Sequence, residues 1–149
     1  MCMGAFRLAF MKYFSYLLTP FLAWLIAGIL KFLINSLRAR RLAFDLIGYG
    51  GLPSNHSAIV SSMATLIGLN EGIQNPAFGV AVALAFIVIL DASSLRRQVG
   101  KHAIAINKLN NLTNQNPSFL RERMGHTRVE IFSGVLVGYV VGYLVWSLS

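Results

Sequence analysis

The sequence has few of the residues that build disulfides or metal sites. Its 149 residues include one cysteine, three histidines and five acidic residues. A single cysteine, Cys2, excludes a disulfide framework and a cysteine-based metal cluster. The few histidines and carboxylates supply a metal site poorly. We therefore expect neither a metal nor another cofactor.

Charged residues are also scarce, which argues against a soluble protein. They make up 12% of the chain, against about 25% in a typical soluble domain. Hydrophobic residues make up 56%, and the mean hydropathy is +0.63. The composition predicts an integral membrane protein, and the length allows one domain over residues 1–149. We expect membrane lipids as partners and no nucleic acid.

Apolar runs predict an all-α integral membrane helical bundle with about four transmembrane helices, at residues 13–37, 57–69, 76–95 and 129–148. A span needs about 20 residues, so the second run is short unless it begins near Pro53. "GKHAIAINKLNNL" is compatible with a further helix at the membrane interface, and "TNQNPS" (113–118) with a loop. The first run contains Lys31 and lacks a small-x-small cleavage site, which favours a span over a signal peptide.

Threading the four spans through a bilayer brings the basic stretches to one side. Every lysine and arginine lies there except Arg7 and Lys12. The positive-inside rule then predicts that this face is cytoplasmic, in the cytoplasmic (inner) membrane, with both termini outside. Cations placed for substrate binding would weaken this inference.

A polar stripe marks the first span. Lys31, Asn35 and Arg38 follow at i, i+4 and i+7, so they share one helix face. Two cations and an amide at headgroup level suit an anion such as a phosphate. The alternative is that Lys31 snorkels to the surface and Arg38 is an ordinary flanking charge.

The stretch "GGLPSNHSA" combines a turn with a helix start. Its glycines and proline predict the turn, and Ser54 or Asn55 can cap the following helix. Free N–H groups at that helix start would favour an anion. His56 is then either a polar cap or a proton donor aimed at a bound group.

A second histidine opens the last span. His126 and Glu130 are four residues apart, so the carboxylate can hold one ring nitrogen and leave the other free as nucleophile or base. Thr127 and Glu130 also fit a capping box, which would occupy the carboxylate structurally.

Further along this span, glycines at every fourth position predict close helix packing, inside the chain or between the chains of a homodimer: Gly134, Gly138 and Gly142. In "DASSLRRQVGKHA", Asp91 is expected to pair with an arginine or histidine at the same depth. We interpret His102 in the same stretch as a solvated interface residue.

These motifs resemble those of the type 2 phosphatidic acid phosphatase superfamily, K-x6-RP, PSGH and SR-x5-H-x3-D. Lys31-x6-Arg38 keeps the first spacing, with Ala39 in place of proline. Residues 53–56, "PSNH", keep the second with asparagine for glycine. His126-x3-Glu130 keeps the core of the third with glutamate for aspartate.

The blocks "GGLPSNHSA", "DASSLRRQVGKHA" and "GHTRVEIFSG" resemble in particular the divergent branch of this superfamily. The third motif departs from its pattern, because Arg121 lies five rather than six residues before His126. The phosphate ligand of that motif is then Arg121, Arg123, or a replacement from Arg96 and Arg97.

The resemblance implies a catalytic set. His126 would attack phosphorus and become phosphohistidine, Glu130 would orient it, and His56 would protonate the leaving oxygen. Asp91 and Asn35 would support the site. The phosphate would be bound by Lys31, Arg38, Arg96, Arg97, Arg121, Ser54 and Asn55.

The expected function is therefore metal-independent hydrolysis of a lipid or isoprenoid phosphate monoester or pyrophosphate. The alternative is a non-catalytic membrane protein that binds or translocates lipid phosphates with the same cationic pocket.

Overall fold

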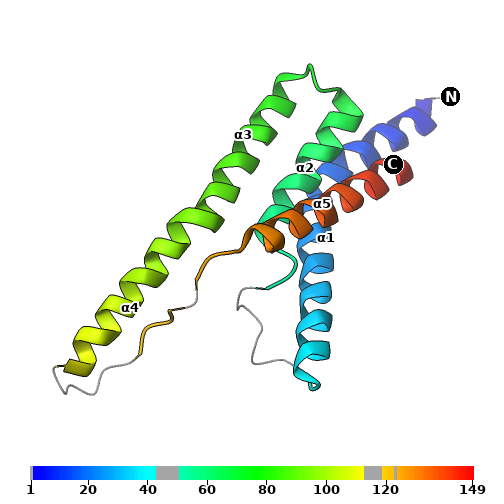
Figure 1. Ribbon diagram of the computed structural model, residues 1–149. Coiled ribbons are helices and arrows are strands. Elements are labelled where there is room, and N and C mark those ends of the chain that lie inside the picture. Colours follow the sequence, from blue (N-terminus) through cyan, green and yellow to red (C-terminus); the bar gives the residue numbers. More distant parts are fainter. Residues whose placement is uncertain (1, 43–50, 113–118, 123) are drawn as a thin grey trace.

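The computed structural model describes residues 2–42, 51–112, 119–122 and 124–149, with side chains from Lys12 onward. Every regular element in these ranges is a helix, so the all-α prediction is confirmed (Figure 1). The elements are α1 (Cys2–Ala39), α2 (Asn55–Glu71), α3 (Pro76–Leu90), the π-helical segment η2 (Asp91–Leu95), α4 (Arg96–Leu112) and α5 (Arg128–Leu148). The predicted loop at 113–118, and Gly50 of the predicted turn, lie outside the described residues.

Three helical stretches are long and apolar enough to cross a membrane: Lys12–Ala39, Pro76–Leu112 and Arg128–Leu148. The second expected span is α2, which has 17 residues and is shorter than the other three. Its first turn carries Asn55 and His56 in place of apolar residues, which is why its apolar stretch is short. The arrangement is a helical membrane bundle, as predicted.

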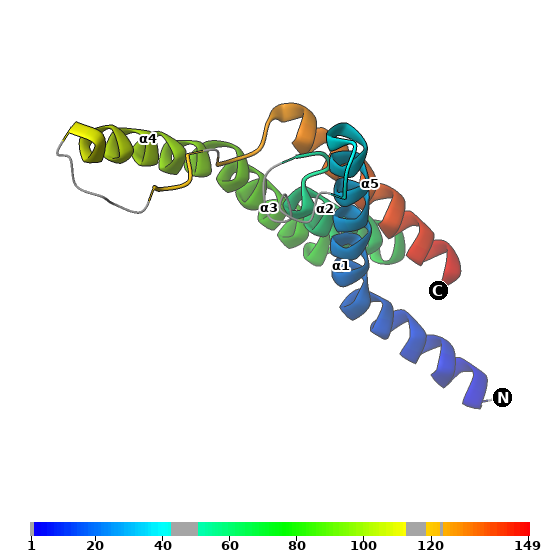
Figure 2. The same ribbon diagram turned by 90° about the horizontal axis from the view of Figure 1, so that it is seen from below.

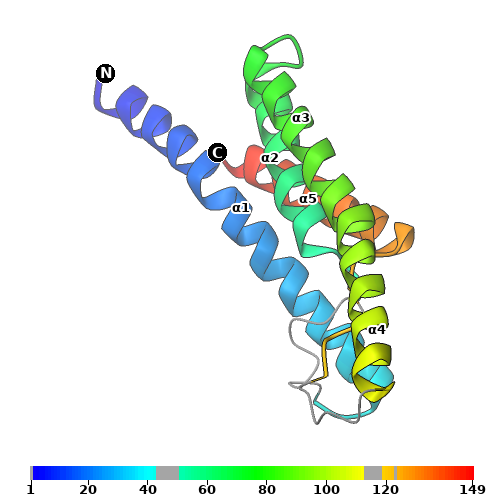
Figure 3. The same ribbon diagram turned by 90° about the vertical axis from the view of Figure 1, so that its left-hand side faces the viewer.

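Helix α4 continues the direction of α3 instead of forming a separate helix at the interface (Figures 1 and 3). No helix breaker separates them, and the Ser94 hydroxyl donates to the Leu90 carbonyl at 2.7 Å within the junction. Together they form 37 helical residues, about 55 Å at ~1.5 Å per residue. The hydrocarbon layer is about 30 Å thick, so the end of α4 extends beyond it.

The tightest packing joins α2 to α5. The ladder glycines allow it, because a Cβ atom at each would collide with a backbone carbonyl of α2 or of its N-cap residue. These carbonyls belong to Ser54 opposite Gly134, Ala58 opposite Gly138 and Ser62 opposite Gly142. The glycine ladder therefore serves packing inside the chain.

Both ends of the chain lie at the same end of the bundle as the α2–α3 turn, whereas α4 projects from the opposite end (Figures 1 and 2). Near the termini, Glu71 accepts a hydrogen bond from the Tyr16 hydroxyl at 2.6 Å and pairs with Lys12 at 3.0 Å. The Tyr16 hydrogen bond, followed by Lys12, lowers the pKa of Glu71. The start of α2, the start of α5 and the α3–α4 junction meet at the other end.

Candidate active site

The carboxylate of Glu130 serves both functions that the sequence suggested. Its Oε2 accepts a hydrogen bond from the Thr127 backbone N–H at 3.2 Å, and the Thr127 hydroxyl accepts from the Glu130 N–H. This is the predicted capping box. The same Oε2 lies 2.9 Å from Nδ1 of His126, and both side chains are buried. Capping and histidine orientation are therefore compatible.

His126 is held from the backbone as well as from its ring. Its N–H donates to the Ala92 carbonyl at 2.9 Å, and its own carbonyl accepts from Arg97 at 3.5 Å. Gly125 before it has φ +87°, a conformation that favours glycine. With Nδ1–H donating to Glu130, Nε2 is the nitrogen left for chemistry.

The start of α2 lies directly beside this histidine. Ser54 caps α2, since its hydroxyl accepts from the Ser57 N–H, and its own N–H donates to the Glu130 carbonyl at 2.9 Å. This joins the first turns of α2 and α5. The ring centroids of His56 and His126 are 5.8 Å apart, with a tilt of 58°. Ser54 itself is fully buried, so its hydroxyl serves the helix cap and is not presented to a ligand.

Arg96 connects the second histidine to a carboxylate. Its Nη2 lies 3.3 Å from Nε2 of His56, and its Nε donates to Asp91 at 3.3 Å. Arginine only donates, so His56 accepts through Nε2 and carries its proton on Nδ1. His56 lies outside the three candidate spans; burial, followed by the positive charges of Arg96, His126 and Lys31, lowers its pKa. The hydrogen bond from Arg96 and the lowered pKa both favour the neutral form of His56 before a ligand binds.

The first helix contributes Lys31 and Asn35. Lys31 is half-buried, and its charge acts on both Glu130 and His56. Asn35 packs against the turn at Gly51, which has φ +143°. Asn55 faces α1, and its side-chain oxygen is buried without a hydrogen-bond partner among the described residues.

Two predicted phosphate ligands are not brought to the histidines. Arg38 is exposed in the last turn of α1, two turns beyond Lys31. Arg121 lies between Leu120 and Glu122, which both hydrogen bond to Asn107, about 16 Å along α4 from Arg96. Arg96 and Arg97 occupy the vicinity of the histidines instead. Arg123 lies outside the described residues.

Sequence reasoning missed the buried Asn107, which holds the segment after α4 against that helix. Its side chain donates to the Leu120 carbonyl at 2.8 Å and accepts from the Leu120 N–H at 2.9 Å. The available signal was a stripe of buried small or polar residues, Gly100, Ala103 and Asn107, of which Gly100 and Asn107 contact this segment.

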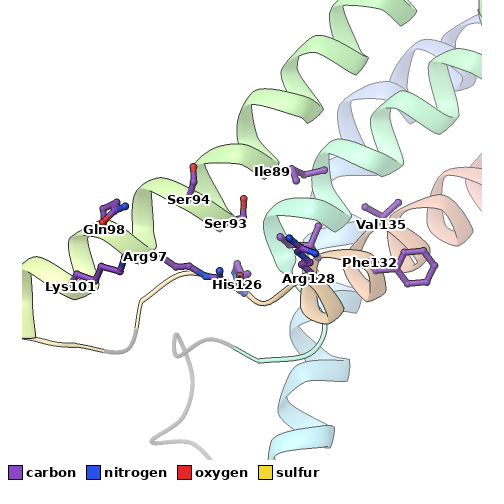
Figure 4. A pocket seen from close by; sticks show the side chains of 11 residues that line it. Ile89, Ser93, Ser94, Arg97, Gln98, Lys101, His126, Arg128, Phe132 and Val135 are labelled. Carbon is purple, nitrogen blue, oxygen red and sulfur yellow. Dashed lines mark hydrogen bonds between the residues drawn. The ribbon is translucent and has the colours of Figure 1, made fainter.

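A cavity of about 680 Å³ adjoins His126 between the α3–α4 helix and α5 (Figure 4). One part is cationic, with Arg97 and Lys101 from α4 and Arg128 from α5. The other part is apolar and includes Ile89, Ile131, Phe132 and Val135. Lys101 and Arg128 were not predicted as site residues, although Lys101 is at i+4 from Arg97 and Arg128 follows His126 by two positions.

The site offers few ligands for a metal ion. In the part of the chain that the structure describes, no three histidine, cysteine or acidic side chains cluster. The absence of a metal cofactor stays a prediction. Proton transfer and attack by His126 at an anion bound by the cations are the chemistry that these side chains can perform.

These features define a helical membrane protein in which two histidines meet beside a group of cations. The profile of the Divergent PAP2 family matches residues 14–141, and the chain belongs to this family. The uncharacterized membrane protein YuiD of Bacillus subtilis (strain 168) is 33% identical over 141 residues, covering 84% of this chain and 89% of YuiD. No solved structure matches. The predicted resemblance and the integral membrane character are confirmed.

Proposed function

We propose that the protein is a metal-independent phosphatase that hydrolyses a lipid phosphate through a phosphohistidine. One observation carries the proposal: the ring of His126, which Glu130 holds, lies 5.8 Å from the ring of His56, which Arg96 holds, between ring centroids. A nucleophile whose tautomer is set, a proton donor and an arginine are the parts that phosphoryl transfer to histidine requires. Since every basic residue but Arg7 and Lys12 falls on this side of the threaded sequence, we place the site at the cytoplasmic face.

In the first step, Nε2 of His126 attacks phosphorus while the bond from phosphorus to the leaving oxygen breaks. His56 gives its proton to that oxygen, and Glu130 stabilises the positive charge that develops on His126. In the second step, His56 takes a proton from water, the water oxygen attacks phosphorus, and the N–P bond breaks to release phosphate.

His56 must be protonated to act as an acid, whereas in the free protein it accepts from Arg96. A bound phosphate resolves this, because its oxygens attract the Arg96 guanidinium and free Nε2 of His56. The negative charge of the phosphate also favours the protonated ring. Lys31 would neutralise a further oxygen from the α1 side.

The lining of the cavity beside His126 favours an amphiphilic substrate. Its cationic part suits a headgroup, and its apolar part suits the beginning of an acyl or prenyl chain that continues into the membrane. The chain would leave between α3 and α5, because Ile89 and Phe132 line the cavity there (Figure 4).

The test is phosphate release from detergent-solubilised lipid phosphates with a chelator present. We expect turnover by the wild type and by His102→Ala, because His102 is exposed on α4 and does not line the cavity. We expect none by His126→Ala. Vanadate, which mimics pentacoordinate phosphorus, should inhibit. Equal release by His126→Ala and wild type would refute the mechanism.

A non-catalytic binder of lipid phosphates is the second candidate. It is favoured by the hydrogen bond from Arg96 to His56, which leaves that histidine without a proton on Nε2 in the free protein. It predicts lipid binding that survives His126→Ala and no phosphate release by any variant.

A further inference from the structure

Three cations line the cavity beside His126, with Arg97 and Lys101 to one side of this histidine and Arg128 to the other (Figure 4). Arg97 and Lys101 are one turn apart on α4, and Arg128 begins α5. No aspartate or glutamate is among the described residues that line this cavity. The nearby acids are already engaged, because Asp91 pairs with Arg96 and Glu130 pairs with His126.

These cations differ from Arg96 and Lys31, which the phosphoryl mechanism uses, although Arg97 also donates to the His126 carbonyl at 3.5 Å. Arg96, Lys31 and His56 do not line the cavity, whereas His126 does. Arg96 and Lys31 can together balance the two negative charges of one phosphate monoester. Lys101 and Arg128 are exposed, so water screens their charges in the free protein, and an anion bound between them and Arg97 would be attracted by all three cations.

We propose that Arg97, Lys101 and Arg128 form a subsite for a second phosphate group, carried by the substrate on the lipid side of the bond that is cleaved. The proposal rests on the phosphatase function. The scissile phosphate lies at His126, the second phosphate lies among these three cations, and the chain follows Ile89, Phe132 and Val135. The preferred substrate is a lipid with two phosphates, and a lipid whose only phosphate is cleaved is a poorer one.

Two kinds of lipid carry a second phosphate on the lipid side of the cleaved bond. In a prenyl diphosphate, the P–O–P bridge breaks and the prenyl monophosphate keeps the second phosphate. In a lipid such as phosphatidylglycerophosphate, the terminal P–O bond breaks and the phosphodiester is kept. In both, His126 takes the terminal phosphoryl group and His56 protonates the oxygen that stays on the lipid.

The experiment compares kcat/KM within two matched pairs: a prenyl diphosphate against its monophosphate, and phosphatidylglycerophosphate against phosphatidic acid with the same acyl chains. We expect the wild type to favour the two-phosphate lipid in at least one pair, which identifies the source. Lys101→Gln combined with Arg128→Gln should lower that preference about tenfold or more, since contacts to charged groups are being removed. Lys108→Gln is the matched control, an exposed lysine two turns further along α4 and outside the cavity, and should keep the preference.

Lipid binding to the His126→Ala protein in nanodiscs separates this proposal from the phosphatase proposal. If the wild type hydrolyses these lipids and the double variant keeps the same preference, the subsite is wrong and the phosphatase proposal is unaffected. If adding the double substitution to His126→Ala weakens binding of the two-phosphate lipid, and adding Lys108→Gln does not, the subsite is supported even if no lipid is hydrolysed. Equal binding by the double variant and its parent would overturn it.

Discussion

At the scale of single residues, Glu130 has two partners on one oxygen. The Thr127 N–H and the His126 ring both donate to Oε2, so the first turn of α5 and the orientation of the histidine depend on the same carboxylate. The charge of this carboxylate affects mainly the histidine, whereas a neutral oxygen can still cap the helix.

Glu130→Gln tests that division. We expect kcat for the lipid phosphate to fall about a hundredfold or more, because the amide does not stabilise the charged His126 ring. Thr127→Ala should instead cost about 1 kcal/mol of stability through the lost cap, with a much smaller loss of rate. Turnover assays and thermal unfolding in detergent measure both. If the two variants lose the same rate, the role of Glu130 is structural.

The pH dependence tests His56. A general acid must be protonated, so kcat/KM should fall as the pH rises through the pKa of His56 in the free protein. Burial and the neighbouring cations hold that pKa below the usual 6.5, which places this decline below pH 6.5. Arg96→Gln removes a cation that lowers the pKa, so the decline should move to higher pH. A decline that stays in place in Arg96→Gln would refute His56 as the acid.

At the scale of elements, the contact between α2 and α5 positions both histidines. The starts of the two helices are joined by the hydrogen bond from Ser54 to Glu130, and the glycine ladder keeps the helices close beyond it. Any residue that separates these helices moves His56 away from His126.

Gly138→Leu should therefore disrupt the bundle. A side chain there would collide with the Ala58 carbonyl and reach the Ser61 Cβ, and overpacking costs typically about 1–3 kcal/mol. Gly79→Leu is the control, because a Cβ at this exposed position of α3 meets no atom within 4 Å. We expect a lower melting temperature and lost turnover only for Gly138→Leu. Equal melting temperatures would contradict the packing described here.

At the scale of the whole molecule, the site, α4 and the start of α5 lie at one end of the bundle, and the α2–α3 turn lies at the other (Figure 1). The cations are concentrated at the site end. A lipid phosphate at this end would be hydrolysed from one leaflet only.

Cysteine labelling determines which leaflet this is. In a Cys2→Ser background, Ile73→Cys places a thiol in the α2–α3 turn, and Lys108→Cys places one on α4; both positions are exposed. We expect a membrane-impermeant maleimide to label Ile73→Cys in intact cells and Lys108→Cys only after permeabilisation. The opposite pattern would place the site outside.

Local spacing made part of the fold and site predictable. Helix geometry alone brings Glu130 to His126, predicts the cap at Thr127 and limits the α2 cap to Ser54 or Asn55, of which the structure shows Ser54, because these partners are three or four residues apart. Apolar runs likewise predicted the helical membrane bundle, since the bilayer demands their length. The family resemblance needed only motif order along the chain.

Only the tertiary structure determined which segments that are distant in sequence contact one another. Only packing shows that Arg96, and not Arg121, reaches His56, because both arginines are close to a motif in sequence. Only packing turns the glycine ladder toward α2 and makes α4 a continuation of α3. Short-range partners are specified by the helix repeat, whereas these contacts depend on which helix faces meet.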